Sequence, residues 1–89
     1  MAGVLNVLYK DMKDDVLENA KQTILRIFEE FKEERVICNK IKQEFDKTYG
    51  ESWNCVVGKN FGSHVIHQTE GYIFCNYNEE ISILLWKSG

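Results

Sequence analysis

The 89-residue sequence contains no proline, no linker-like segment and no long run of apolar residues. A helix that crosses a membrane needs about 20 predominantly apolar residues, so we expect a soluble protein with no membrane partner. Stretches rich in proline, glycine or serine often separate domains, and none is present. Because a chain this short builds one hydrophobic core, residues 1–89 are predicted to form a single domain.

Cysteine is scarce, with only Cys38, Cys55 and Cys75. Their odd number and the lack of a Cys-x-x-Cys spacing argue against a disulfide scaffold. The first residues show neither the basic segment nor the cleavage site of a signal peptide, so we expect an intracellular protein whose thiols are reduced and pack in the core. Short domains without disulfides often gain stability by associating, which makes a dimer attractive.

An excess of basic charge is also missing. Lysine and arginine together number 11 against 14 aspartates and glutamates, which gives a net charge of −3. A protein that follows nucleic-acid phosphates presents a clustered basic face. The charge therefore excludes nucleic acid as the expected partner and favours other proteins.

The sequence contains no complete phosphate-binding, metal-binding or catalytic motif. The segment Gly58–Gly62 lacks the Gly-Lys-Ser/Thr ending of a phosphate-binding loop. His64 and His67 are three residues apart on a predicted strand and point to opposite faces, so they do not share a metal ion with Cys55 or Cys75. We predict no enzyme, no cofactor and no metal; a cysteine–histidine nucleophile is the alternative that the sequence leaves open.

The period of the apolar residues predicts two helices and then a sheet. A helix is expected from about Lys13 to Phe31, and a second one ends at Gly50, where glycine is a natural stop. Their inward residues are expected to be Val16, Ala20, Ile24, Ile27, Phe28 and Phe31, followed by Val36, Ile37, Ile41, Phe45 and Tyr49.

Strand-like segments follow Gly50. They are Trp53–Val57, His64–Gln68, Tyr72–Tyr77 and Ile81–Lys87, and Val4–Leu8 could add one more. The last segment is almost continuously apolar, so it should lie in the centre of the sheet. Helices followed by antiparallel strands indicate the α+β class, with both helices packed on one face of the sheet.

The block Trp53–Ser63, with the sequence WNCVVGKNFGS, strongly resembles the dynein light chains of the light-chain-eight (eight-kilodalton) family. Ile41–Lys47 and Ile83–Gly89 are also similar to that family, and only the first ten or so residues do not match clearly. The resemblance implies a strand-exchanged homodimer, in which the strand around Ser63–His67 crosses to the partner's sheet. It also implies a non-catalytic hub, an accessory light chain of the dynein microtubule motor, located in the cytoplasm on the cytoskeleton.

The same resemblance implies how partners bind. Short disordered motifs of the Thr-Gln-Thr kind, including one in the dynein intermediate chain, would add an antiparallel strand. The glutamine would reach the unpaired N–H groups where the second helix starts. The implied peptide-binding residues are Glu34, Arg35, Asn60, Phe61, Gly62, Ser63, His64, Val65, Ile66, His67, Tyr72 and Phe74. The implied dimer interface comprises Asn54, Phe61, Gly62, Ser63, His64, Val65, Ile66 and His67.

Three residues depart from the family pattern. His64 replaces a tyrosine and Ile66 replaces a threonine in the implied peptide pocket, which favours an altered choice of peptide. An alternative is therefore a divergent member that dimerises a scaffold protein other than dynein. Asn54 stands where the family commonly has a histidine, and asparagine cannot titrate.

Overall fold

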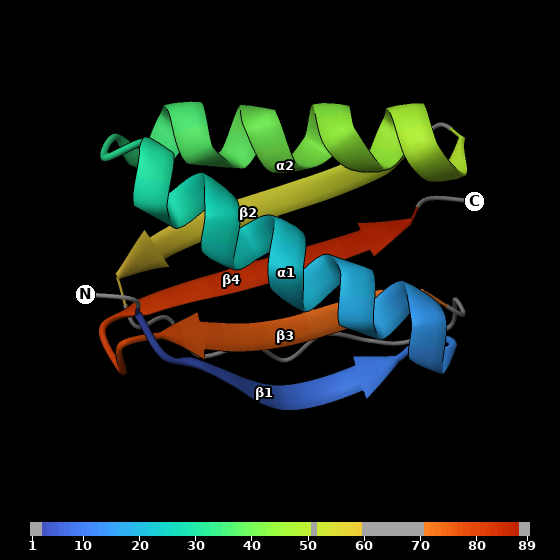
Figure 1. Ribbon diagram of the computed structural model, residues 1–89, viewed down its shortest axis with the longest axis horizontal. Coiled ribbons are helices and arrows are strands. Elements are labelled where there is room, and N and C mark those ends of the chain that lie inside the picture. Colours follow the sequence, from blue (N-terminus) through green and yellow to red (C-terminus); the bar gives the residue numbers. More distant parts are fainter. Residues whose placement is uncertain (1–2, 51, 60–70, 88–89) are drawn as a thin grey trace.

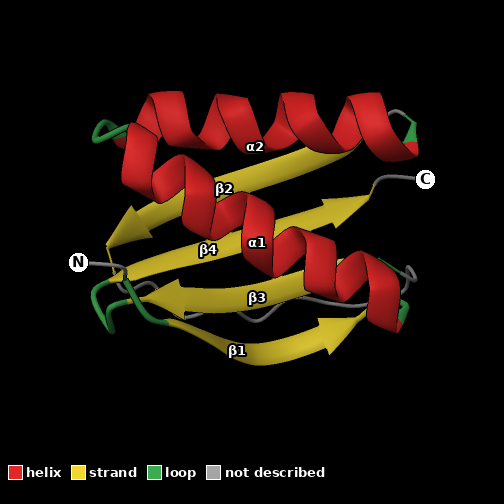
Figure 2. Cartoon of the chain, viewed as in Figure 1, coloured by secondary structure: helices red, strands yellow, loops and turns green. Residues whose placement is uncertain are grey.

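The computed structural model describes residues 3–50, 52–59 and 71–87. Two helices lie over one face of an antiparallel sheet, as Figures 1 and 2 show, and the predicted α+β class is confirmed. In chain order the elements are β1 (Leu5–Asp11), α1 (Asp14–Glu30), α2 (Glu34–Tyr49), β2 (Trp53–Lys59), β3 (Tyr72–Tyr77) and β4 (Ile81–Lys87). The segment His64–Gln68, expected as a further strand, lies outside the described residues.

Within the described ranges the sheet has four strands in the order β1-β3-β4-β2. All neighbouring pairs are antiparallel. The β4 strand pairs with β3 on one side and β2 on the other, so the central position predicted from its apolar sequence is confirmed. The leading strand runs over Leu5–Asp11 rather than Val4–Leu8, and β1 and β2 form the two edges of the described sheet.

Both helices agree closely with the sequence pattern. The buried residues of α1 are spaced three or four apart and turn one stripe toward the sheet. Helix α2 begins at Glu34, within the charged segment Lys32–Arg35 that separates the apolar patterns of the two helices. It ends at Gly50, which has a φ of 83° and donates its N–H to the Asp46 carbonyl oxygen at 3.1 Å. A residue without a Cβ adopts this left-handed φ at little cost, which explains the stop.

The core lies between the helices and the sheet. Ile24 and Ile41 are fully buried from the helix side, and Ile83 and Leu85 of β4 are fully buried from the sheet side. The complete cluster is Ala20, Ile24, Ile27, Phe28, Ile37, Ile41, Phe45, Trp53, Ile73, Cys75, Ile83 and Leu85. Burial of this much apolar side-chain surface is the main term that stabilises so short a domain.

The central strands carry apolar side chains on both faces. Ile73 and Cys75 of β3 join the helix-side core, whereas Tyr72 and Phe74, at the alternate positions, turn to the other face and are also buried. On that face the Phe74 ring stacks with Tyr9 of β1, with 6.3 Å between the ring centroids. This two-sided burial explains why β3 and β4 read as continuous apolar runs rather than as alternating patterns.

The end of α2 is fastened to the start of β2. The Asp46 carboxylate accepts hydrogen bonds from the Lys42 ammonium and from the backbone N–H of Trp53, the latter at 2.8 Å. Both hydrogen bonds lower the pKa of Asp46, and the bond from Lys42 has the larger effect. The Trp53 ring in turn meets Phe45 edge-on, with 4.8 Å between centroids. The helix and the strand are thereby held side by side from their junction onward.

The turn between β3 and β4 generates a stability prediction. Asn78 and Glu79 have φ values of 54° and 60°, a region that costs an ordinary side chain about 1–2 kcal/mol. Asn78 forms two hydrogen bonds with the backbone of Val4, both at 2.8 Å. A substitution of Asn78 would remove a contact as well as strain, so Glu79 is the better position for the test. We expect Glu79→Gly to raise the free energy of unfolding by roughly 0.5–1 kcal/mol, since glycine removes the strain but adds chain entropy.

Chemical denaturation monitored by circular dichroism measures the effect. Glu80→Gly is the matched control, because Glu80 follows the strained pair and its φ is not positive. The control should be neutral or destabilising. An equal loss of stability in both glycine variants would contradict the assignment of strain to Glu79.

Candidate functional site

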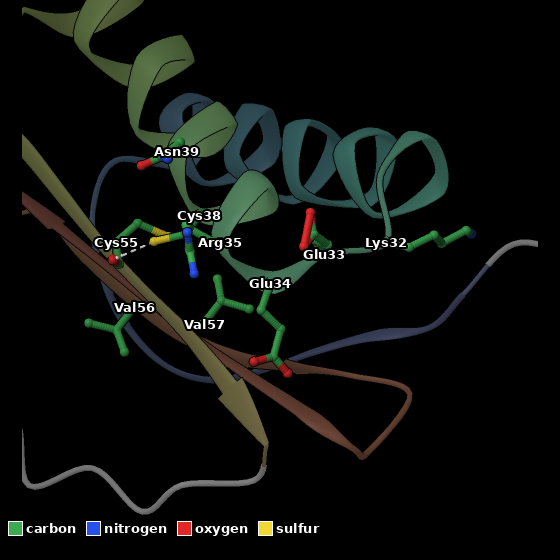
Figure 3. Close-up of a pocket in the computed structure, with 9 residues that line it drawn as sticks. All are labelled: Lys32, Glu33, Glu34, Arg35, Cys38, Asn39, Cys55, Val56 and Val57. Atoms are coloured by element: carbon green, nitrogen blue, oxygen red, sulfur yellow. Dashed lines mark hydrogen bonds between the residues drawn. The ribbon is translucent and has the colours of Figure 1, made fainter.

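A hollow of about 690 Å³ lies between the start of α2 and the strand β2. We call it the α2–β2 hollow (Figure 3). Its lining residues are Lys32, Glu33, Glu34, Arg35, Cys38, Asn39, Cys55, Val56 and Val57. One wall is therefore a helix start and the other is an edge strand of the described sheet, two features that both offer backbone hydrogen-bonding groups.

The helix wall presents backbone donors. Glu33 precedes α2 in an extended conformation and makes no side-chain capping bond. The first N–H bonded within this turn belongs to Ile37, which donates to the Glu33 carbonyl oxygen at 3.0 Å. The N–H groups of Glu34, Arg35 and Val36 therefore precede the first hydrogen bond of the helix ladder. They are suited to an oxygen acceptor that enters the hollow.

The side chains of the hollow carry both signs of charge. Lys32 and Arg35 are balanced by Glu33 and Glu34. A pocket for a phosphate or another strong anion would show a cationic excess. The balance fits a peptide with uncharged polar side chains better than it fits a charged small ligand.

Two thiols form the inner part of the hollow. Cys38, on the second turn of α2, donates from its Sγ to the Cys55 carbonyl oxygen of β2 at 2.7 Å. A hydrogen bond from the Cys55 thiol is the main cause that lowers the pKa of Cys38 from 9.0 to about 7; partial burial opposes the shift, and the Val57 N–H supports it. The same bond and burial raise the pKa of Cys55 well above its usual range. The two thiols are thus unequal near neutral pH.

The third cysteine behaves differently. Cys75 is fully buried among the core side chains, and this burial raises the pKa of its thiol to about 12. The prediction that the cysteines pack in the core holds for Cys75, which belongs to the core cluster, and for Cys55, which packs against it; Cys38 belongs to neither group. Cys38 and Cys55 are partly buried and line the hollow.

A family comparison decides what kind of protein this is. The family model described as "Dynein light chain type 1" matches residues 5–88. The chain belongs to the dynein light chain type 1 family. Members of this family are small adaptors without catalytic activity that act through protein–protein interactions, so the resemblance seen in the block around Trp53 is confirmed.

Solved structures agree on the fold of this dynein light chain. The dynein light chain-like domain of the Fasciola hepatica calcium binding protein FhCaBP2 superimposes with a TM-score of 0.76 at 19% identity, covering 98% of this chain and 93% of that one. A mercury derivative of the same domain gives a TM-score of 0.71 at 20% identity, covering 96% and 92%. At such identities the likeness concerns the fold alone.

The expected peptide-binding residues separate into three groups. Glu34 and Arg35 line the α2–β2 hollow. Tyr72 and Phe74 lie on β3, with β4 between them and β2, and do not contribute to the hollow. Asn60, Phe61, Gly62, Ser63, His64, Val65, Ile66 and His67, from both the peptide-binding and the dimer-interface sets, lie outside the described residues. Asn54 is described and half-buried, opposite Trp86 of β4.

Sequence reasoning missed part of the hollow, including Lys32, Asn39 and both of its cysteines as site residues. One sequence signal could have identified Cys38 as a site residue: it follows Arg35 by three residues and therefore lies on the same helix face.

In the part of the chain that the structure describes, no group of three or more histidine, cysteine or acidic side chains could hold a metal ion. No helix among the described residues is long and apolar enough to span a membrane.

The unequal thiols predict a pH profile. Alkylation requires the thiolate, so the rate at Cys38 should rise with pH and reach half its maximum near pH 7. Cys75, with its pKa raised to about 12, should stay unreactive over the same range. Iodoacetamide labelling of the native chain followed by peptide mass mapping measures both rates.

Cys55→Ala is the informative variant, because it removes the thiol that donates to Cys38. The half-maximum for Cys38 should then move upward, toward the ordinary cysteine value. The charged residues Lys32, Glu33, Glu34 and Arg35 share the hollow and stay unchanged in this comparison. A half-maximum of about 8.5 already in the unaltered chain would contradict the assignment.

Proposed function

We propose that this dynein light chain is a homodimeric hub that binds short linear motifs of partner proteins as an added β-strand. It would serve as an accessory light chain of the cytoplasmic, microtubule-associated dynein motor. The observation that carries the proposal is the position of β2 at an edge of the described sheet, beside the uncapped start of α2.

The edge supplies the means of attachment. Among the described strands β2 pairs only with β4 (Figure 1). Its residues Cys55, Val56 and Val57 line the α2–β2 hollow. An edge strand offers a row of backbone N–H and C=O groups to another chain. In our proposal the segment Ser63–His67 of a second copy pairs here, and the peptide then adds on the outer side of that segment.

A dimer would also bring the expected site residues together. Within one chain, Glu34 and Arg35 line the α2–β2 hollow, whereas Tyr72 and Phe74 of β3 do not. With strand exchange, one subunit provides the start of α2 and the other provides Asn60–His67. Each dimer then has two equivalent grooves related by its two-fold axis.

The chemistry of the hollow favours a glutamine-containing motif. A side-chain amide oxygen can accept from first-turn N–H groups without adding charge to a hollow whose charges already balance. Thr-Gln-Thr-like segments, such as that expected in the dynein intermediate chain, have this property. Two grooves would hold two such chains in parallel, since the second binding event becomes intramolecular.

The oligomeric state is the first prediction. Sedimentation equilibrium at neutral pH should give twice the mass of one chain. Because Asn54 cannot titrate, the dimer should persist as the pH falls from about 7 to about 5, whereas an Asn54→His variant should dissociate with a midpoint near 6.5. A monomeric unaltered chain, or one that dissociates with that same midpoint, would disprove this part of the proposal.

Peptide binding is the second prediction. Calorimetric titration with a Thr-Gln-Thr-type peptide should show two peptides per dimer. The same peptide N-methylated at alternate backbone nitrogens should bind at least about tenfold more weakly, because strand addition depends on main-chain hydrogen bonds. Equal affinity of both peptides, or no binding by a folded dimer, would contradict strand addition.

The helix start allows a sharper variant. Glu34 is the first residue of α2 and follows an extended residue, so proline fits there without breaking the helix. Glu34→Pro removes one N–H donor and should weaken binding about three- to tenfold, whereas the control Glu34→Ala keeps that donor and should bind as the unaltered chain does. Equal weakening in both variants would assign the effect to the carboxylate instead.

A further inference from the structure

The α2–β2 hollow contains a chemical feature that peptide binding does not use. Cys38 and Cys55 come from different elements, 17 residues apart in sequence, and the Cys38 sulfur touches the backbone oxygen of Cys55. Figure 3 shows their side chains side by side between the helix and the strand. Both residues are partly buried and line the hollow, whereas Cys75 is fully buried. Two neighbouring thiols can react with each other as well as with a reagent.

Their environments assign each thiol a different role. As a thiol, Cys38 donates to the Cys55 carbonyl oxygen; once deprotonated, its sulfur can accept from the Cys55 thiol and the Val57 N–H, which lowers the pKa of Cys38. The Cys55 thiol is the donor in this pair and keeps its proton. A thiolate attacks an electrophile, and a neighbouring protonated thiol can then resolve the product. Cys38 is therefore the attacking group and Cys55 the resolving group.

We propose that Cys38 and Cys55 form an oxidation site at which a peroxide converts the two thiols into a reversible intramolecular disulfide. The carrying observation is the contact between the two residues across α2 and β2. The inference stands independently of the dimer and of peptide binding. It concerns only side chains that a single chain provides.

The reaction balances with hydrogen peroxide as the oxidant. The Cys38 thiolate attacks one peroxide oxygen, the O–O bond breaks, and hydroxide leaves and takes up a proton as water. The resulting sulfenic acid on Cys38 is attacked by the Cys55 sulfur, which loses its proton. The S–S bond forms as the S–O bond breaks, and a second water leaves. Two electrons from the two sulfurs have then reduced one peroxide to two waters.

The disulfide has a structural consequence. It would close a loop from the second turn of α2 to β2 and fasten the helix to the edge strand at a second point, beyond the Asp46–Trp53 junction. Cross-linking lowers the entropy of the unfolded chain. The oxidised protein should therefore melt at a higher temperature than the reduced protein, and a thiol reductant should reverse the shift.

The test uses the full chain, reduced and then exposed to a small excess of hydrogen peroxide at neutral pH. After free thiols are blocked with iodoacetamide, intact mass should show the loss of two hydrogen atoms, and peptide mapping should find Cys38 linked to Cys55. The product should migrate as a single chain without reductant. The reaction at Cys38 should exceed that at Cys75 by at least about tenfold, since only a thiolate reacts fast.

Three serine variants separate the roles. Cys55→Ser should stop at the sulfenic acid, detected on Cys38 with dimedone, and Cys38→Ser should leave Cys55 unoxidised under the same conditions. Cys75→Ser is the matched control and should form the Cys38–Cys55 link as the unaltered chain does. Circular dichroism verifies that each variant is folded.

Other outcomes would overturn the proposal. These are oxidation spread equally over the three cysteines, a link between two chains in place of the internal one, or overoxidation of Cys38 without any link in the unaltered chain. Because the unaltered chain alone gives a decisive result, the test does not depend on the folding of a variant.

Discussion

The packing of α2 along β2 is the interaction on which the proposed functions of this dynein light chain depend. At one end the Asp46 carboxylate accepts the Trp53 N–H, and the Trp53 ring meets Phe45. Toward the other end Cys38 bonds to the Cys55 carbonyl. These contacts hold the edge strand against the helix. The uncapped helix start and the strand edge therefore face the same hollow in a fixed relation.

This arrangement is suited to binding rather than catalysis. The first turn of α2 and the edge of β2 offer backbone groups, and the charges of Lys32, Glu33, Glu34 and Arg35 balance. Backbone groups recognise an extended chain whatever most of its side chains are, which is what an adaptor with several partners requires. Family membership, the edge position of β2 and the balanced charges of the hollow thus all fit the proposal that this chain binds peptides.

The dithiol lies in the wall of the same hollow. Cys38 is on the helix side and Cys55 is on the strand side, so a bond between them would join the two walls. Binding and oxidation would then act on the same pair of elements. The helix–strand packing that shapes the proposed peptide site also brings together two thiols with unequal pKa values.

The sequence by itself determined the local elements and the family. The three- and four-residue spacing of Ile24, Ile27 and Phe28 predicts one face of a helix, Gly50 predicts a stop, and the apolar run of Ile81–Lys87 predicts a central strand. Each of these is a short-range pattern, because helix and strand periods repeat within a few residues. The block Trp53–Ser63 identified the family for the same reason, as a contiguous motif.

Only the tertiary structure decided which distant residues meet. The sequence suggested Glu34 and Arg35 through the family resemblance, yet it treated Cys38 and Cys55 as ordinary core residues. Their contact depends on how the chain reverses after α2, so that β2 runs back along the helix. The pKa of each thiol in turn depends on that contact. No period along the chain encodes a hydrogen bond between residues on different elements, since its geometry exists only after the elements pack together.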